Sequence, residues 1–122
     1  MNTPKIDYDL KLNRELAEAL GWTEIFETKG ALLGRPPGGS PRSRDQGMIP
    51  NWTGSFNECC ELGLTYRITP HQATIENFMY HMREEHGIEL DFKRAYRHFM
   101  IRKVLERLRD QEADRALACA AL

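Results

Sequence analysis

The sequence has no long apolar run and little excess of charge of either sign. Its longest apolar stretches span only a few residues, far below the ~18 needed to cross a bilayer. Its first residues, MNTPKIDYDLK, contain no apolar segment of the kind that directs secretion. A formal net charge of -1 gives no overall attraction to nucleic acid or to anionic lipid. These absences predict a cytoplasmic protein that binds neither membranes nor long nucleic acids.

Cysteine is also scarce, and its spacing is uninformative. Cys59, Cys60 and Cys119 cannot all pair with one another, and a bond between the adjacent Cys59 and Cys60 would be strained. No C-x-x-C spacing is present, and a structural zinc site needs four converging donors. Free cysteines most often act as small buried apolar side chains. We therefore expect three reduced thiols, no bound metal and no cofactor.

Recognisable catalytic motifs are absent as well. Ser40, Ser43 and Ser55 do not lie in a G-x-S-x-G motif, and no pair of carboxylates stands out. His81 and His86 flank two glutamates, but the helix of a zinc hydrolase needs its histidines four residues apart. A separation of five residues turns two side chains ~140° apart around a helix that advances ~100° per residue. The sequence therefore favours a non-enzymatic protein.

The composition that remains is that of an ordinary globular protein, with 41% hydrophobic and 29% charged residues among 122. Disordered chains have less apolar content and more net charge, and a chain of this length can bury roughly two-thirds of its surface. We expect one domain over residues 1–122, with a flexible N-terminus at residues 1–9 and a long loop rich in Gly, Pro and Arg at residues 35–50.

Two local patterns describe the first third of the chain. Leucines recur one turn apart over residues 9–20, which is typical of an amphipathic helix, and Gly21 should end it. Residues 23–29 and 31–33 then predict a hairpin. We expect this hairpin to be the first half of a small sheet.

The loop at residues 35–50 contains four prolines and three glycines, which exclude a continuous helix and an inner strand. Loops of this length are uncommon inside a compact domain, and they tend to be either functional or disordered. The loop is therefore the first place to look for a binding site, and a mobile solvated connection is the alternative.

Helix boundaries can be predicted in the second half of the chain. Ser55 and Glu58 have the spacing of a capping box, so a helix should begin there and close at Gly63. Residues 64–68 alternate enough to predict a strand. Thr69 and Pro70 then supply an N-cap and a first helical residue.

The two helices expected after this point cover residues 70–86 and 91–110, the second one capped by Asp91. An alanine-rich tail at residues 112–122 should form a helix that docks on the body. The two helices have matching apolar stripes and should pack on each other and on the sheet through Phe78, Met82, Tyr96, Phe99 and Leu105. The predicted fold is α+β, a small antiparallel sheet layered with helices as an α-β-α sandwich, followed by a long C-terminal helical segment.

Three stretches resemble the phage ABA sandwich domain family: LAEALGW at residues 16–22, GRPPGG at residues 34–39 and IPNWTGSFN at residues 49–57. The end of the chain, DRALACAAL, looks like the closing helix of that family. The resemblance covers residues 10–64 and, more weakly, the last ten. It implies a layered α-β-α fold, a phage origin and hence the cytoplasm of a host cell, and no catalytic residues.

A second, more distant similarity concerns layout alone. A Gly-Trp helix end, a polar loop with a tryptophan and a helix begun by Thr-Pro follow one another as in phage counter-defence sponges of the Thoeris anti-defence 1 type. Such a resemblance implies a protein that sequesters cyclic ADP-ribose-like signals.

A local anion site is the most specific functional hypothesis. Arginine's planar fork suits phosphate, and backbone N–H groups of a glycine-rich loop can approach an anion closely. Aromatic rings can stack a base. The candidate ligand-binding residues are Arg35, Arg42, Arg44, Trp52, Thr53 and Tyr66. The alternative is a set of solvated arginines around a core tryptophan.

Two functions are therefore carried forward. The first is a counter-defence sponge that binds a small anionic nucleotide-type signal, such as a cyclic ADP-ribose derivative or a cyclic oligonucleotide. The second is an oligomeric adaptor or an inhibitor that binds a host protein. Seven basic residues between positions 93 and 109 give the last helix a cationic face, which would be solvated or would line a partner site. A homo-oligomer is expected in either case.

Overall fold

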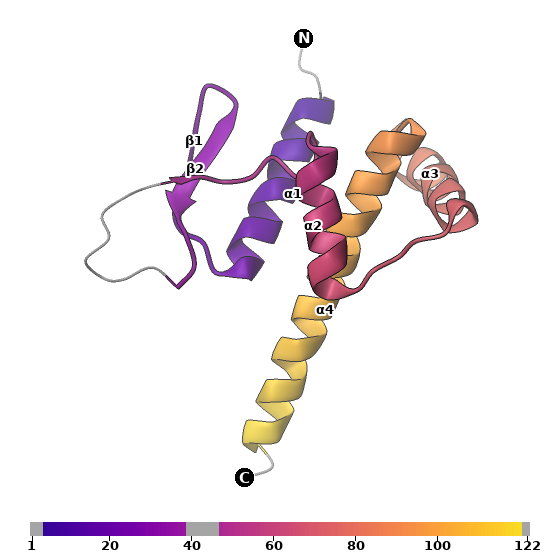
Figure 1. Cartoon of the computed structure of the whole chain (residues 1–122). Helices are drawn as coiled ribbons and strands as arrows, with labels where there is room; N and C mark the ends of the chain where they lie inside the picture. Colours follow the sequence, from indigo (N-terminus) through magenta and orange to yellow (C-terminus); the bar gives the residue numbers. More distant parts are fainter. Residues whose placement is uncertain (1–3, 39–46, 121–122) are drawn as a thin grey trace.

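The computed structural model describes residues 4–38 and 47–120. Within these residues the chain forms four helices and three strands in the order α1 (Pro4–Leu20), β1 (Thr23–Thr28), β2 (Ala31–Arg35), β3 (Gly47–Met48), α2 (Phe56–Tyr66), α3 (Gln72–His86) and α4 (Phe92–Ala120). The α+β class, the small antiparallel sheet and the long C-terminal helix are as predicted (Figure 1). None of the helices in the described ranges is long and apolar enough to cross a membrane.

The first helix and the hairpin occur where the sequence predicts them. α1 begins at Pro4, so residues 4–9, expected to form a flexible end, belong to the helix instead, and Gly21 follows its last residue. Lys29 and Gly30 have positive φ angles of 50° and 78°, the backbone of a two-residue hairpin turn. The sheet order is β1-β2-β3, with both pairs antiparallel.

The predictions for α2 are correct at its start and wrong at its end. Ser55 caps the helix by accepting a hydrogen bond from the Glu58 N–H group. The helix continues past Gly63 to a left-handed residue, Arg67, and the strand expected at residues 64–68 is not formed. Gly63 is buried, and a Cβ atom there would lie 3.0 Å from Cε of Met100. This glycine therefore allows α2 to approach α4 closely and does not stop the helix.

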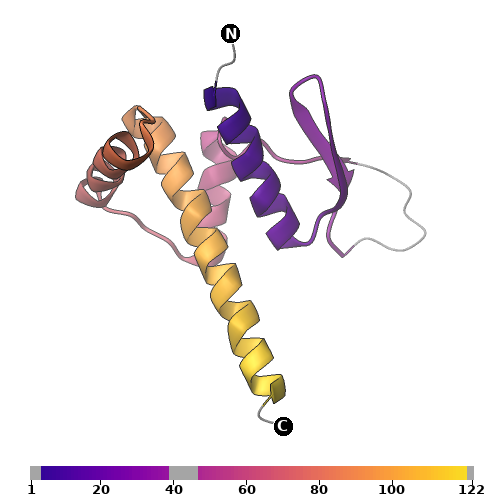
Figure 2. The same cartoon turned by 180° about the vertical axis from the view of Figure 1, so that it is seen from behind.

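The last two helices show a similar mixture. The N-cap of α3 is His71, and not Thr69 as predicted, whereas Gly87 closes the helix as expected. Asp91 caps α4, because its Oδ1 accepts a hydrogen bond of 2.8 Å from the N–H group of Arg94. The tail does not dock: residues 109–120 are exposed, and this part of α4 projects from the body (Figures 1 and 2).

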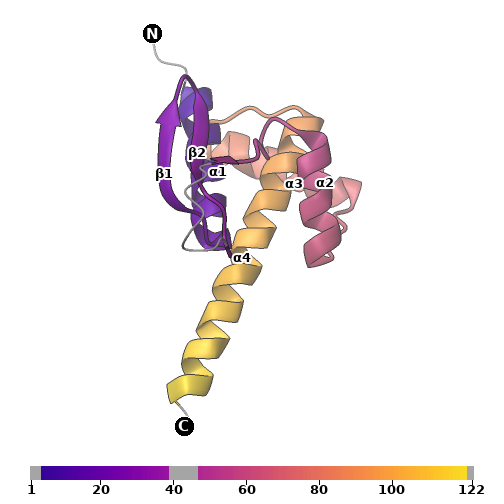
Figure 3. The same cartoon turned by 60° about the vertical axis from the view of Figure 1, so that its left-hand side comes forward.

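The first half of α4 is the centre of the packing, since α1, α2 and α3 all contact it. The sheet is contacted by α1, which packs on β2, while α2 and α3 lie on the far side of α4 (Figure 3). The main core joins α1, α2, β2 and α4, and includes Leu16, Leu32, Trp52, Leu62 and Ile101.

A second apolar cluster joins α3 to α4 and includes Ile75, Met82, Leu90 and Ala95. The predicted packing of the last two helices on each other is confirmed. The predicted packing of α3 on the sheet is wrong, because this cluster contains no strand residue and α3 lies beyond α4. Phe92, the first residue of α4, is exposed.

Candidate functional site

The candidate binding residues do not converge within the described part of the chain. Arg35 ends β2, and its Nε lies 2.7 Å from Oε2 of Glu24, so its charge is already paired. Tyr66 ends α2 and packs partly buried against the main core. Arg42 and Arg44 lie outside the described residues. Arg35 therefore lies at the end of β2, and Tyr66 lies at the end of α2, a helix on the far side of α4 from the sheet (Figure 3).

Trp52 and Thr53 are parts of the interior. Each is 4% exposed, and Trp52 lies within the main core. The side chain of Asn13 in α1 forms three hydrogen bonds with this segment. Its Nδ2 donates to Oγ1 of Thr53 at 3.0 Å and to Oδ1 of Asn51 at 2.9 Å. Its Oδ1 accepts from the Thr53 N–H group at 3.1 Å. These bonds fix the segment before α2 against α1. Neither Trp52 nor Thr53 therefore offers an open surface to a ligand.

Arg97 completes this polar cluster from the side of α4. Its Nε donates a hydrogen bond of 2.7 Å to the carbonyl oxygen of Thr53. A guanidinium bonded to a buried backbone acceptor satisfies a group that would otherwise be costly to bury. This arginine therefore belongs to the fold, although it lies on the helix face that the sequence suggested was solvated or partner-facing.

A second polar cluster ties α1 to α4. Asp9 Oδ2 lies 2.8 Å from Nη2 of Arg94, and its Oδ1 lies 2.8 Å from Nε2 of His98, which is fully buried. The ring of Tyr8 stacks on that of His98 at 5.4 Å. Burial by itself raises the pKa of the Asp9 carboxyl, but the hydrogen bonds and charges of His98 and Arg94 outweigh it and lower the pKa.

These groups do not form a catalytic constellation with a thiol. Cys59 is buried and donates a long hydrogen bond of 3.6 Å to the carbonyl oxygen of Arg97. Burial, together with the neighbouring Cys60, raises the pKa of the Cys59 thiol to about 12. A thiol that stays protonated is a poor nucleophile and a poor metal ligand.

The feature best suited to a ligand is a groove between α1, α3 and α4, which we call the three-helix groove. It has a volume of about 640 Å³, within the range of small-molecule sites. Three aromatic rings line it, one from each helix: Tyr8, Phe78 and Phe99. The Phe78 and Phe99 rings meet edge to face with their centres 5.6 Å apart.

Four basic side chains also line the groove, and two of them are neutralised by carboxylates. Nζ of Lys103 lies 3.3 Å from Oε2 of Glu106, and Nη2 of Arg109 lies 3.8 Å from Oε2 of Glu15. The other two are Lys11 and Arg102. Among the residues the structure describes, neither of these two forms an ion pair. A third carboxylate, that of Asp110, also lines the groove, so the lining carries one more basic than acidic side chain.

Arg102 is the unusual member of this lining. Its guanidinium lies over the rings of Tyr8 and Phe78, 5.5 Å and 6.0 Å from their centres. Its Nε is buried and has no hydrogen-bond partner in the described parts of the chain, and the same holds for the hydroxyl oxygen of Tyr8. Burial lowers the pKa of Arg102. A partly desolvated cation without a counter-charge is costly to keep in a fold.

A second hollow of about 640 Å³ lies between α3 and the start of α4 and is less suited to an anion. Its lining contains more acidic than basic groups, and one of its two arginines, Arg94, is already bonded to Asp9.

Part of this arrangement has a signal in the sequence. His98 follows Ala95 by three residues and precedes Leu105 by seven, which places it on the buried face of α4. A histidine at such a position indicates a buried polar contact. The groove itself has no such signal, because its three aromatic rings come from three separate helices.

Comparisons of the chain with models of protein families, with curated proteins and with solved structures found no match.

Proposed function

We propose that the protein binds a small anionic ligand that carries an aromatic ring, of nucleotide type, in the three-helix groove, and that it holds this ligand without chemical conversion. The observation that carries the proposal is Arg102, a partly buried guanidinium with no ion pair among the described residues, in the wall of a groove of about 640 Å³. A ligand anion beside this group would supply the missing counter-charge.

The aromatic rings support the second half of the proposal. Tyr8, Phe78 and Phe99 offer apolar walls in the same groove as the cations. Nucleotides combine a flat ring with phosphate, and proteins bind them by stacking together with charge-assisted hydrogen bonds. The resemblance to phage proteins suggests which nucleotides to test first: immune signals such as cyclic ADP-ribose derivatives and cyclic oligonucleotides, which a phage protein would sequester in the cytoplasm of its host.

The test is calorimetric titration of the protein, dialysed against EDTA, with cyclic oligonucleotides, ADP-ribose derivatives and inorganic phosphate. We expect a nucleotide to bind with Kd below about 100 µM, which corresponds to more than ~5 kcal/mol. Arg102→Met should weaken binding at least ~tenfold, because a charge-assisted hydrogen bond contributes ~1.5–3 kcal/mol.

Lys93→Met is the matched control. Lys93 is an exposed basic residue of α4 outside the groove, so its loss removes the same charge from the same helix. Equal effects of the two substitutions would show that only overall charge matters. No binding by any nucleotide would contradict the proposal.

A second candidate function rests on the projecting end of α4. Residues 109–120 are exposed, and they include Leu117, which is 69% exposed. An unpacked helical segment of this length is only marginally stable in water, and most helical stability in proteins comes from packing. We propose an oligomeric adaptor or an inhibitor of a host protein as this alternative. Truncation after Asp110, followed by sedimentation analysis, tests this alternative. We expect the truncated chain to lose self-association, and an unchanged oligomeric state would contradict the alternative.

A further inference from the structure

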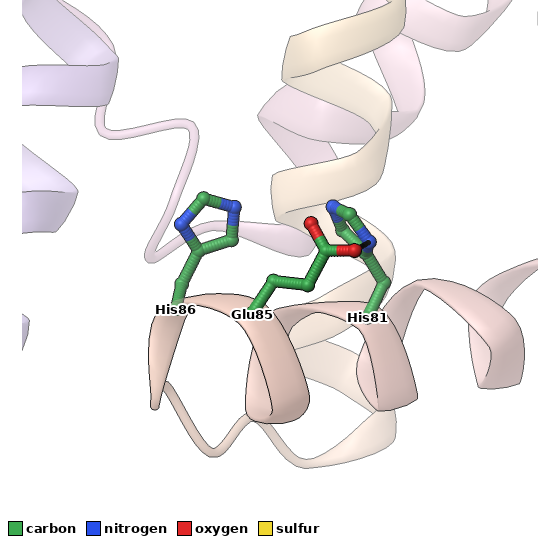
Figure 4. Close-up of side chains that lie close together, drawn as sticks. All are labelled: His81, Glu85 and His86. Atoms are coloured by element: carbon green, nitrogen blue, oxygen red, sulfur yellow. Dashed lines mark ion pairs between the residues drawn. The ribbon is translucent and has the colours of Figure 1, made fainter.

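The last turns of α3 carry three close side chains of the types that can ligate a metal ion. His81, Glu85 and His86 each offer one ligand atom, and these three atoms lie within 4.8 Å of one another. Figure 4 shows the three side chains rising from the same side of the helix end, with both imidazole rings beside the carboxylate. The centres of the His81 and His86 rings are 5.5 Å apart.

This proximity corrects the expectation drawn from helix geometry. A separation of five residues turns the two Cα–Cβ bonds ~140° apart, yet each imidazole is long enough to swing back toward the other at the end of the helix. The carboxylate of Glu85, one turn after His81, lies between them: its Oε1 is 3.5 Å from Nδ1 of His81.

We propose that this cluster binds one Zn²⁺ ion through two imidazole nitrogens and one carboxylate oxygen. Zinc–donor distances of ~2.0–2.2 Å in a tetrahedron place the donors ~3.4 Å apart. The separation of 3.5 Å between Nδ1 of His81 and Oε1 of Glu85 is already close to this value. The remaining separations need a movement of about an ångström, which exposed side chains make by rotation.

The surroundings favour a cation at this position. The cluster lies at the C-terminal end of α3, which closes at Gly87, and the carbonyl end of a helix carries partial negative charge. His81 and His86 are exposed, and the one ion pair of His81 in the described structure is with Glu85 itself. A metal ion can therefore reach these side chains without breaking contacts to other residues.

Three protein ligands leave a fourth position of the metal open. Both histidines also line the three-helix groove, so the open position is next to the groove that contains Arg102. A bound anion there would complete the coordination. The metal site does not depend on this, however, and it stands or falls separately from the proposed nucleotide binding.

The experiment is a calorimetric titration of the protein with ZnCl₂ alone, without nucleotide. The protein carries Cys119→Ser, because Cys119 is exposed and a free thiol could bind zinc on its own. One equivalent of zinc should bind. His81→Ala and His86→Ala should each weaken binding at least ~tenfold, since even the partners of metal ligands contribute ~10–100-fold.

Two controls come from the same helix. His71 is an exposed imidazole at the N-cap of α3, whose side chain makes no capping bond. Glu84 is an exposed carboxylate next to the site that pairs with Arg83. His71→Ala and Glu84→Gln should therefore bind zinc as the Cys119→Ser protein does, and all four variants should keep its circular dichroism spectrum. Absence of zinc binding, binding that survives His86→Ala, or a thiolate absorption band in the Co²⁺ form would overturn the proposal.

Discussion

Arg97 and Arg102 lie little more than one turn apart on α4, and both side chains are partly buried, yet they end in opposite situations. Nε of Arg97 donates to the carbonyl oxygen of Thr53 at 2.7 Å. Nε of Arg102 is buried with no partner in the described residues. The difference separates two uses of one residue type: the first arginine completes the fold, and the second lines a groove without forming an ion pair in the described structure.

The comparison depends on α4 being fixed by its neighbours, and the largest effect should come from loosening it. Ile101 lies between the two arginines and is fully buried. Ile101→Ala should lower the free energy of unfolding by ~2–5 kcal/mol, because it leaves a cavity in a packed core. Urea denaturation measures this. Leu117→Ala, on the exposed end of the same helix, is the control, and an equal loss in both variants would contradict the packing described.

The next effect should come from the polar cluster that contains the acceptor of Arg97. Asn13→Ala removes the acceptor of the buried Thr53 N–H group, and a stranded buried donor costs ~1–3 kcal/mol. The same denaturation assay tests it against Asn57→Ala, which alters an exposed residue of α2. A loss below ~0.5 kcal/mol would show that this cluster is not important for the fold.

Acid should weaken a third arginine contact, that of Arg94 with Asp9. The folded-state pKa of Asp9 is below the usual value of 3.8 for this carboxyl, so the carboxylate stabilises the fold above that value. This contribution is lost as the pH falls through the lowered pKa. Stability measured from about pH 5 to about pH 2 should therefore fall less steeply in Asp9→Asn than in the unsubstituted protein. Parallel curves would contradict the assignment.

The smallest expected effect is that Cys59 is protected from chemical modification of its thiol, which donates to the carbonyl oxygen of Arg97. Because burial raises the pKa of this thiol to about 12, it should stay unreactive toward a disulfide reagent until the protein unfolds. The exposed Cys119 should react rapidly, and Cys119→Ser should remove that phase. Rapid modification of Cys59 in the folded protein would show that α2 leaves α4 near Arg97.

Local chemistry in the sequence was enough for much of the fold. Ser55 and Asp91 cap helices as predicted, since capping depends on neighbours within one turn. Gly63 was misread because its role depends on Met100 of α4, far along the chain. The boundary at Thr69 was wrong by two residues, and nothing in the structure explains why His71, which lacks a capping bond, takes the N-cap position.

The candidate site was harder to predict because a sequence does not say which arginines are paired. Arg35 has an ion-pair partner on the neighbouring strand, and Arg97 has a hydrogen-bond acceptor in the loop before α2. Arg102 has neither an ion pair nor a hydrogen bond of its Nε in the described structure. Trp52 is of a residue type that can stack on a base, but its side chain is enclosed in the main core. The pairing of a charge depends on tertiary contacts, so composition and spacing could not separate a structural arginine from one that lines a groove.

The most direct test measures unfolding free energy and nucleotide affinity together in Arg97→Met and Arg102→Met. Arg97→Met should lose ~1.5–3 kcal/mol of stability, the contribution of a hydrogen bond to a charged group, and should bind the nucleotide about as well as the unsubstituted protein. Arg102→Met should keep its stability within ~1 kcal/mol, because no ion pair is broken, and should lose at least ~tenfold in affinity. If both variants lose stability equally and bind equally well, the distinction between the two arginines is wrong.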